Sequence, residues 1–146
     1  MEHRPEPAAR VEAVIDAALE LAATLQDRLY EFNVEQTGYD DGRWLTFQAV
    51  LDGELAGGLH GWTWGGTAWV DVLWIAAAHR RGGLGSALLG AAEAEAAQRG
   101  CAQIALGTYT FQAQPFYQRH GYETVGFLDE HPRRYGHYTM RKRLVS

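Results

Sequence analysis

The stretch Asp71-Val-Leu-Trp-Ile-Ala-Ala-Ala-His-Arg-Arg-Gly-Gly-Leu-Gly-Ser86 decides how this 146-residue chain is interpreted. It begins as an apolar strand and continues, after a short connection, into a glycine-rich turn that opens an alanine- and leucine-rich helix. Such a turn leaves backbone N–H groups without partners at the positive end of the helix dipole. The segment therefore predicts a site for an anionic group, most often a phosphate, with Arg80 and Arg81 beside it.

Strand patterns surround this segment on both sides. Upstream, Asp52-Gly53 is a strong hairpin signal between two strands, and a third strand completes an antiparallel meander. The expected strands are 44–51, 54–64, 67–75, 103–109, 122–127 and 138–144, and the expected helices after the meander are 84–98 and 114–120. We therefore predict an α+β fold with a mixed, mostly antiparallel central sheet flanked by helices.

The beginning of the chain is less decisive. Residues 1–9 contain two prolines and are expected to form a flexible tail, and residues 10–146 are expected to form one domain. Apolar residues at helical spacing allow this domain to begin with one long helix. Alternation over 11–15 allows a short strand first, followed by a helix that is capped by Asp16 and ends near Asn33.

Composition excludes several classes of protein. The hydrophobic fraction of 47% is too high for a disordered chain, and no apolar run reaches the roughly 18 residues that a membrane span needs. The net charge of −5 argues against general binding to nucleic acid, which requires a basic surface. The first residues lack the apolar segment of a signal peptide. We expect a cytoplasmic protein without nucleic-acid or membrane partners.

Cysteine and histidine give no sign of a metal. Cys101 is the only cysteine and opens an apolar run, so we expect a buried thiol. The six histidines have no zinc-ligand spacing, and we predict that no metal is bound. The basic run Arg141-Lys142-Arg143 is interpreted as solvation of an edge or terminal strand.

The phosphate ligand can be narrowed by what the glycine-rich turn lacks. A P-loop needs a lysine and a serine or threonine after its last glycine, but Gly85 is followed by Ser86 and an alanine. A dinucleotide-binding turn needs a third glycine, and Leu88 stands in its place. Nucleotide hydrolysis and a dinucleotide-dependent redox domain are therefore disfavoured.

A third pattern fits. The spacing Arg80-x-x-Gly83-x-Gly85 resembles the coenzyme A pyrophosphate loop of the GNAT superfamily of acyl-CoA N-acyltransferases. Phe111-Gln-Ala113-Gln-Pro-Phe116-Tyr117-Gln-Arg-His-Gly121-Tyr122 resembles the later family motif N-x-x-A-x-x-F-Y-x-x-x-G-F, with Thr110 at the position of the usual asparagine. The resemblance implies an acetyl-CoA-dependent N-acetyltransferase. The alternative is a noncatalytic coenzyme A-binding or regulatory protein of the same fold.

The resemblance also implies roles for individual residues. The main chain of Leu73, Trp74 and Ile75 would pair with the pantetheine arm of the cofactor. The other residues implied in cofactor binding are Arg80, Arg81, Gly82, Gly83, Leu84, Gly85, Ser86, Thr110, Ala113 and Phe116. Tyr117 would protonate the departing thiolate, and a backbone N–H near Trp74 or Ile75 would stabilise the oxyanion.

The general base and the acceptor remain open at this stage. Asp71 is the first candidate for the base and His60, on the adjacent strand, the second. Glu35 and Asp40 are candidates to attract a cationic substrate, with surface solvation as their simpler role. The expected partner is a small-molecule or peptide amine. A homodimer is compatible with the exposed strands, but no residue requires it.

Overall fold

The computed structural model describes residues 9–16 and 18–144. These fall into two units, Met1–Gly38 and Tyr39–Ser146, which are described separately. The predicted tail lies outside the described residues except for residue 9. Among the described residues, no helix has both the length and the apolar character that a membrane crossing requires.

The described part of the first unit forms one helix, α1 (Ala18–Thr37). Residues 10–16 have no regular structure, so both the short strand over 11–15 and a long helix that begins at residue 10 are wrong. The helix continues four residues past the expected end at Asn33 and stops at Gly38, whose φ of 79° interrupts the helical backbone. No residue of α1 is buried within this structure.

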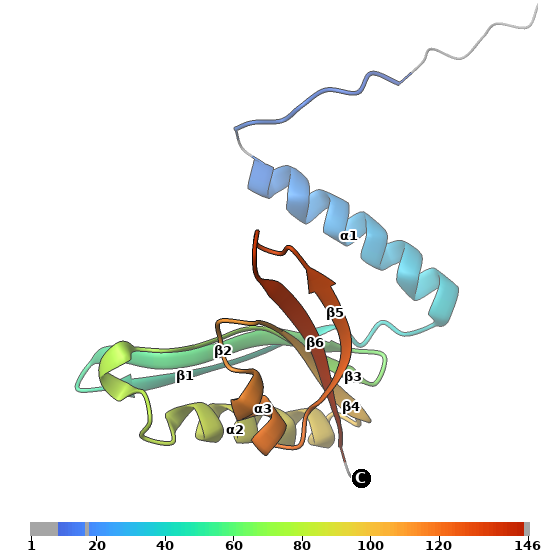
Figure 1. The fold of residues 1–146 in the computed structure, drawn as a ribbon. Coiled ribbons are helices and arrows are strands. Elements are labelled where there is room, and N and C mark those ends of the chain that lie inside the picture. Colours follow the sequence, from blue (N-terminus) through green and yellow to red (C-terminus); the bar gives the residue numbers. More distant parts are fainter. Residues whose placement is uncertain (1–8, 17, 145–146) are drawn as a thin grey trace, which may run out of the picture. The chain divides into compact units, whose positions relative to one another are not determined.

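The second unit is built on one six-stranded sheet (Figure 1). Its strands are β1 (Arg43–Leu51), β2 (Glu54–Trp64), β3 (Thr67–Ile75), β4 (Gln103–Tyr109), β5 (Glu123–Asp129) and β6 (Gly136–Arg143), and its helices are η1 (Ala77–His79), α2 (Leu84–Gln98) and α3 (Gln114–Arg119). The strand order is β1-β2-β3-β4-β6-β5, with β3 and β4 parallel and the other neighbours antiparallel. The predicted α+β fold with a mixed, mostly antiparallel sheet is confirmed.

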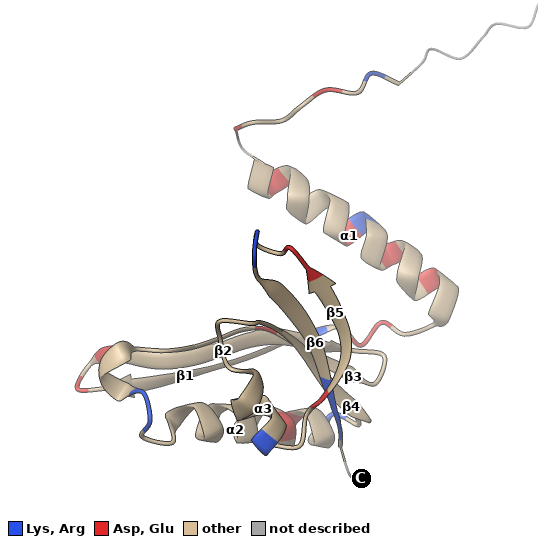
Figure 2. Ribbon diagram, in the orientation of Figure 1, with Lys and Arg blue, Asp and Glu red and all other residues tan. Residues whose placement is uncertain are grey.

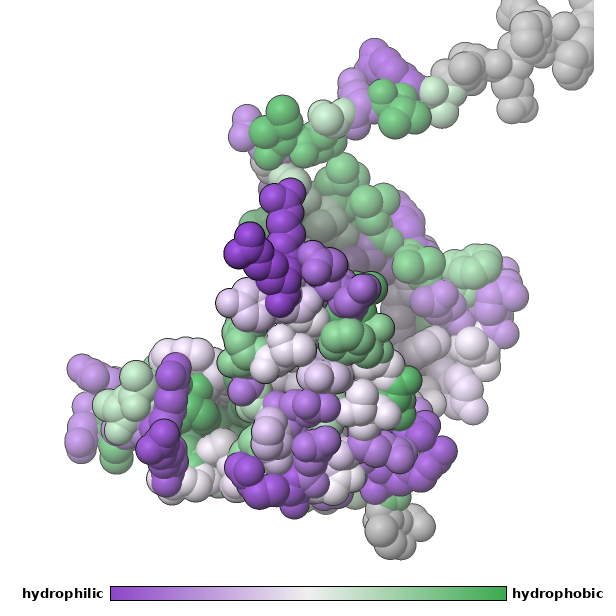
Figure 3. Space-filling model, viewed as in Figure 1, coloured by the Kyte–Doolittle hydropathy of each residue, from purple (hydrophilic) through white to green (hydrophobic). Residues whose placement is uncertain are grey.

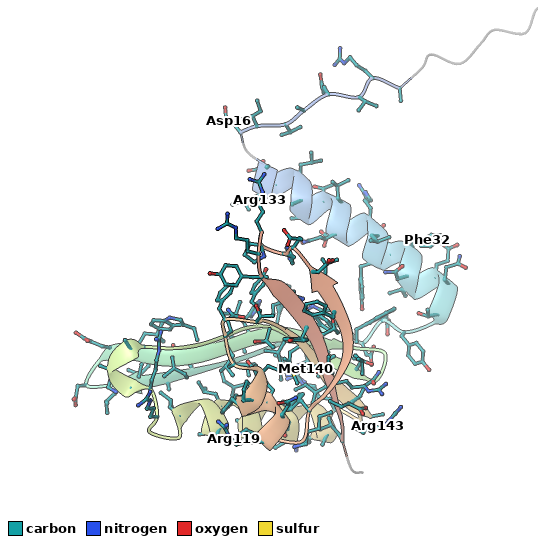
Figure 4. The ribbon with its side chains drawn as sticks, in the orientation of Figure 1. Asp16, Phe32, Arg119, Arg133, Met140 and Arg143 are labelled. Carbon is teal, nitrogen blue, oxygen red and sulfur yellow. The ribbon has the colours of Figure 1, made fainter. Side chains whose placement is uncertain are left out.

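The core lies between this sheet and the helices α2 and α3, which cover one of its faces (Figure 1). Helix α2 buries Leu88, Leu89, Ala92 and Ala96, a stripe at the spacing of successive helical turns. The stripe packs with Ile104 and Leu106 of β4 and with Met140 of β6, which Figure 4 labels. The outer surface of the helices is mostly hydrophilic in the view of Figure 3.

One sequence expectation about the sheet is corrected in part. The basic run at residues 141–143 belongs to β6, which is the last strand along the chain, as one alternative had it, but lies inside the sheet between β4 and β5 and is not an edge. Two of its cations are therefore paired across elements: Lys142 contacts Glu93 of α2 at 2.6 Å, and Arg141 contacts Glu123 of β5 at 2.9 Å. A charged residue on an inner strand needs such partners because its neighbours limit its access to water.

Candidate active site

A β-bulge at Asp71 opens a gap in the middle of the sheet. On β2, His60 and Gly61 are adjacent, but they pair with Val72 and Val70 of β3, so Asp71 is the extra residue. A Cβ atom at Gly61 would overlap the main chain at Trp69, which explains why glycine stands opposite the bulge. Bulges bend a strand and increase its twist. The parallel pairing of β3 with β4 ends at Val70, next to the bulge.

Beyond this point β3 and β4 diverge, and we call the space between residues 71–75 and residues 107–109 the fork. Leu73, Trp74 and Ile75 pair with β2 on one side only. The alternation of an antiparallel ladder directs about every second N–H and C=O of this segment away from β2 and into the fork. Only alternate residues of this segment therefore turn their main-chain groups into the fork, and the Ile75 carbonyl already accepts a hydrogen bond from Arg80.

Both candidates for the general base lie at the bulge. Asp71 is exposed, and no hydrogen bond or ion pair to its carboxylate occurs within the described residues. His60 lies next to the bulge on β2 and is half-buried. Its Nδ1 shares a 2.8 Å hydrogen bond with the Thr46 hydroxyl, which leaves only Nε2 for other partners. Asp71 is therefore the less engaged of the two groups, and the role of either as the base stays a prediction.

The glycine-rich turn opens α2 as the sequence predicts. Gly83 is the N-cap residue, and its φ of 85° lies in the left-handed region that favours glycine. No side chain caps the helix, and the first main-chain bond of the helix joins the Ala87 N–H to the Gly83 carbonyl at 3.0 Å. The N–H groups of Leu84, Gly85 and Ser86 are therefore without an intrahelical acceptor, as expected at a helix start.

The approach to these N–H groups is open and basic. A Cβ atom at Gly83 would meet nothing within 4 Å, and one at Gly82 would meet only a carbonyl oxygen at 3.7 Å. Arg80 and Arg81 are exposed in this loop, which Figure 2 shows as a basic segment ahead of α2. Arg80 donates from Nε to the Ile75 carbonyl at 3.2 Å, so its guanidinium is held at the end of β3. A pocket of about 370 Å³ borders the loop at Arg80 and Gly82.

Helix α3 brings the two sequence motifs together. A Cβ atom at Gly85 would lie 3.4 Å from the Phe116 ring and 3.9 Å from the Ile75 side chain. The glycine thus lets the α3 ring pack directly over the start of α2 and the end of β3. A second link, which sequence reasoning missed, is the 2.9 Å hydrogen bond between the Ser86 hydroxyl and His120 Nε2. The only sequence signal for it was that His120 lies inside the later motif.

Tyr117 lies on the inner face of α3. Its side chain is 7% exposed and belongs to the core, and its ring meets the Phe116 and Tyr122 rings edge to face at 5.1 and 5.7 Å. Burial disfavours the phenolate and raises the pKa of Tyr117 to about 12. No hydrogen bond of its hydroxyl occurs within the described residues. The phenol therefore keeps its proton at neutral pH and has a hydrogen bond left to donate.

The remaining predicted cofactor residues have other local roles as well. Ala113 is the N-cap residue of α3, and its N–H donates to the Thr108 hydroxyl at 3.3 Å. The Thr110 hydroxyl accepts from the Gly136 N–H at 3.3 Å, so it already has one partner where the family motif has asparagine. A cofactor contact of Thr110 stays a prediction.

Three further expectations concern groups away from the fork. Glu35 and Asp40 are both exposed, in the first and second unit respectively. Cys101 is 7% exposed, as predicted, and burial raises the pKa of its thiol. Within residues 9–16 and 18–144, no group of three or more His, Cys, Asp or Glu side chains is placed to hold a metal ion.

Comparison with known proteins identifies the family. A model of the Acetyltransferase (GNAT) family matches residues 11–122, more than half of the chain. The chain belongs to this family. Blasticidin-S acetyltransferase of Streptomyces morookaense is 42% identical over 93 residues, which cover 61% of this chain. The match covers 66% of that relative, just under two thirds of its length.

Solved structures agree with the family. An acetyltransferase from Bacillus cereus ATCC 14579 superimposes with a TM-score of 0.78 at 25% identity, covering 93% of this chain and 98% of that one. An aminoglycoside 6'-N-acetyltransferase complexed with coenzyme A shares the fold, with a TM-score of 0.63 at 20% identity over 92% of this chain and 97% of that one. The prediction of a GNAT N-acetyltransferase enzyme is confirmed.

Proposed function

We propose that this GNAT family member transfers the acetyl group of acetyl-CoA to the primary amine of a small molecule by direct attack. The observation that carries the proposal is the meeting of three elements. The start of α2, the free edge of β3 and the ring of Phe116 on α3 all come together at Gly85. A turn with free main-chain N–H groups, an unpaired strand edge and the helix that carries Tyr117 are thereby adjacent.

The residues of the loop fit the pyrophosphate of coenzyme A. The N–H groups of residues 84–86 lack intrahelical acceptors, and open space above Gly82 and Gly83 allows close approach to the main chain. Arg80 and Arg81 would add charge-assisted bonds to the phosphate oxygens. The pantetheine amides would then pair with the edge of β3 at residues 73–75, as an added strand does. This places the thioester at the fork.

The reaction requires three contributions from the protein: a base, an oxyanion donor and an acid. The amine must lose its extra proton, for which Asp71 is proposed as the base, directly or through water. The nitrogen then attacks the thioester carbonyl, and a free main-chain N–H near Trp74 or Ile75 stabilises the oxyanion of the tetrahedral intermediate. The C–S bond breaks, and the departing sulfur takes the proton of Tyr117. The Tyr117 phenol is suited to this step because it stays protonated in its buried position.

The acceptor is proposed to be a small-molecule amine. The family relative named above carries blasticidin S in its name, and a protein of the same fold is named for aminoglycosides. Blasticidin S and the aminoglycosides should therefore be tested first in a panel of acceptors. The match to blasticidin-S acetyltransferase covers 61% of this chain, so the acceptor is assigned as a class and not as a compound.

Thiol release from acetyl-CoA over a panel of amines tests the proposal. Tyr117→Phe is expected to lower kcat by roughly 10²–10⁴-fold, the usual contribution of a positioned acid, with little change in acetyl-CoA affinity. Tyr138→Phe is the matched control, because this half-buried phenol packs on Phe127 of the β5–β6 hairpin. A purified protein that neither binds acetyl-CoA nor releases thiol with any amine would refute the proposal.

A further inference from the structure

Five aromatic rings gather where β4 ends, and neither the fold nor the proposed chemistry requires them. They come from the end of β4, the loop after it, the β5–β6 turn and the start of β6. We call this group the aromatic cluster: Tyr109, Phe111, His131, Tyr135 and His137. Phe111 and Tyr135 are 56% and 50% exposed, an unusual state for large apolar rings that lie next to one another.

Tyr109 is the centre of the aromatic cluster. Its ring is stacked nearly parallel to Phe111, with an interplanar angle of 5° and a centroid distance of 5.4 Å. His137 meets it edge to face at 4.7 Å and His131 in a tilted arrangement at 5.4 Å. Tyr135 completes the group with an edge-to-face contact to Phe111 at 5.0 Å. The parallel pair, in which Tyr109 is half-buried and Phe111 is exposed, thus has edge-to-face or tilted rings on its flanks.

Main-chain bonds hold the segments that carry these rings. The Tyr109 N–H donates to the Gln112 side chain at 2.8 Å, and the Thr110 N–H donates to the Gly136 carbonyl at 2.9 Å. The β5–β6 turn closes with the Tyr135 N–H on the Pro132 carbonyl at 2.9 Å. A Cβ atom at Gly107 would overlap the His137 ring, so glycine at this position is needed for the ring to lie over β4. The aromatic cluster is therefore preorganised.

The position of the aromatic cluster links it to the fork. Tyr109 is the last residue of β4, and residues 107–109 form the β4 side of the fork. The acetyl group would be delivered from the β3 side, so a molecule bound on Tyr109 and Phe111 lies at the mouth of the same gap. Charge at the turn is mixed, with Asp129 and Glu130 at the end of β5 and Arg133 at the tip (Figures 2 and 4). The rings, and not a net charge, are the distinctive chemistry of this surface.

We propose that the aromatic cluster is an acceptor subsite that stacks a planar, π-bonded ring carried by the amine substrate. The inference rests on the proposed function, because it assumes that the acceptor enters the fork. Offset-stacked and edge-to-face contacts are the favoured geometries between aromatic rings, and the half-exposed rings of Phe111 and Tyr135 are the ones that an incoming ring can reach. A saturated ring of the same size gains only the general hydrophobic contact.

A matched pair of amines tests this subsite. We compare kcat/KM for 2-phenylethylamine and 2-cyclohexylethylamine, which differ in the planarity and π electrons of the ring. The wild-type enzyme is expected to prefer the planar amine by about 2–10-fold, the range that aromatic pairs contribute. Phe111→Leu and Tyr109→Leu are expected to remove this preference while the KM for acetyl-CoA stays unchanged.

Phe127→Leu provides the control. Phe127 is 56% exposed, as Phe111 is, but it packs on Tyr138 outside the aromatic cluster. This variant is expected to keep the preference for the planar amine. Equal kcat/KM values for the two amines in the wild type, or a preference that survives both cluster variants, would overturn the subsite.

A binding measurement distinguishes failure of the subsite from failure of the proposed function. Binding of the two amines is also measured by titration with coenzyme A present, independently of turnover. Turnover without ring preference overturns only the subsite. Ring-selective binding that Phe111→Leu abolishes, without thiol release from any amine, supports the subsite and overturns the proposed function. Neither turnover nor ring-selective binding overturns both.

Discussion

Removing the hydroxyl of Tyr117 should change how the stability of this protein depends on alkaline pH. The pKa of Tyr117 rises from 10.0 to about 12 because burial disfavours the phenolate. The unfolded chain loses this proton above pH 10, whereas the folded chain keeps it until about pH 12. The stabilisation is therefore complete below pH 10 and is lost as the pH rises from 10 to 12. Two pKa units correspond to about 2.7 kcal/mol.

Urea unfolding, followed by tryptophan fluorescence at pH 8, 10, 11 and 11.5, measures this effect. The quantity of interest is the difference in unfolding free energy between wild type and Tyr117→Phe. We expect the difference to be constant below pH 10 and to change in favour of the variant above it, approaching about 2.7 kcal/mol near pH 12.

Two further variants test whether burial of the hydroxyl causes the effect. Tyr122→Phe should act in the same direction, because burial and the nearby Glu93 carboxylate raise the pKa of Tyr122 as well. Tyr135→Phe removes a hydroxyl from a ring that is half exposed and serves as the control for the loss of an exposed hydroxyl. A pH-independent difference for Tyr117→Phe would refute the reasoning, since the phenol would then not be desolvated in the fold.

Three other predictions follow from described contacts. Gly83→Ala forces an alanine to a φ of 85° and should lower stability by about 1–2 kcal/mol, which thermal unfolding measures. Gly82→Ala has room for its methyl group and should lower mainly the affinity for acetyl-CoA, which ligand titration measures. Lys142→Met leaves the Glu93 carboxylate without its cation, and the Glu93 side chain is only 14% exposed. The free energy of unfolding in urea should fall by about 1–3 kcal/mol, and adding Glu93→Gln should recover part of this loss. Cys101 should react with a thiol reagent much more slowly in the native protein than in urea, because it is buried and its pKa is raised.

Elements with local signals could be predicted from the sequence. Helix α2 has its predicted bounds because its start and end are marked by glycines, Gly83 and Gly100, that adopt positive φ. The hairpin at Asp52-Gly53 was equally clear, since both residues occupy positive φ. The phosphate loop and the motif around Tyr117 were found for the same reason: each is contiguous in the chain.

Features that depend on long-range pairing could not be predicted in this way. The position of β6 inside the sheet depends on which strands pair, and its charged residues gave the opposite impression until their partners on α2 and β5 were known. The aromatic cluster draws on residues 109–111 and 131–137, which no local pattern relates. The Ser86–His120 bond also joins residues 34 positions apart.

The bulge at Asp71 has a consequence for the side chains of β3. Val70 on one side of it and Leu73 and Ile75 on the other all pack against the core, so the inward positions are spaced by two residues except for one interval of three. A chain that lacked residue 71 would have unbroken alternation and the same inward side chains. Such a strand could continue its parallel pairing with β4 past Val70. A single residue therefore separates a closed sheet from an open one, and deleting it should preserve the core while closing the space in which the reaction is proposed to occur.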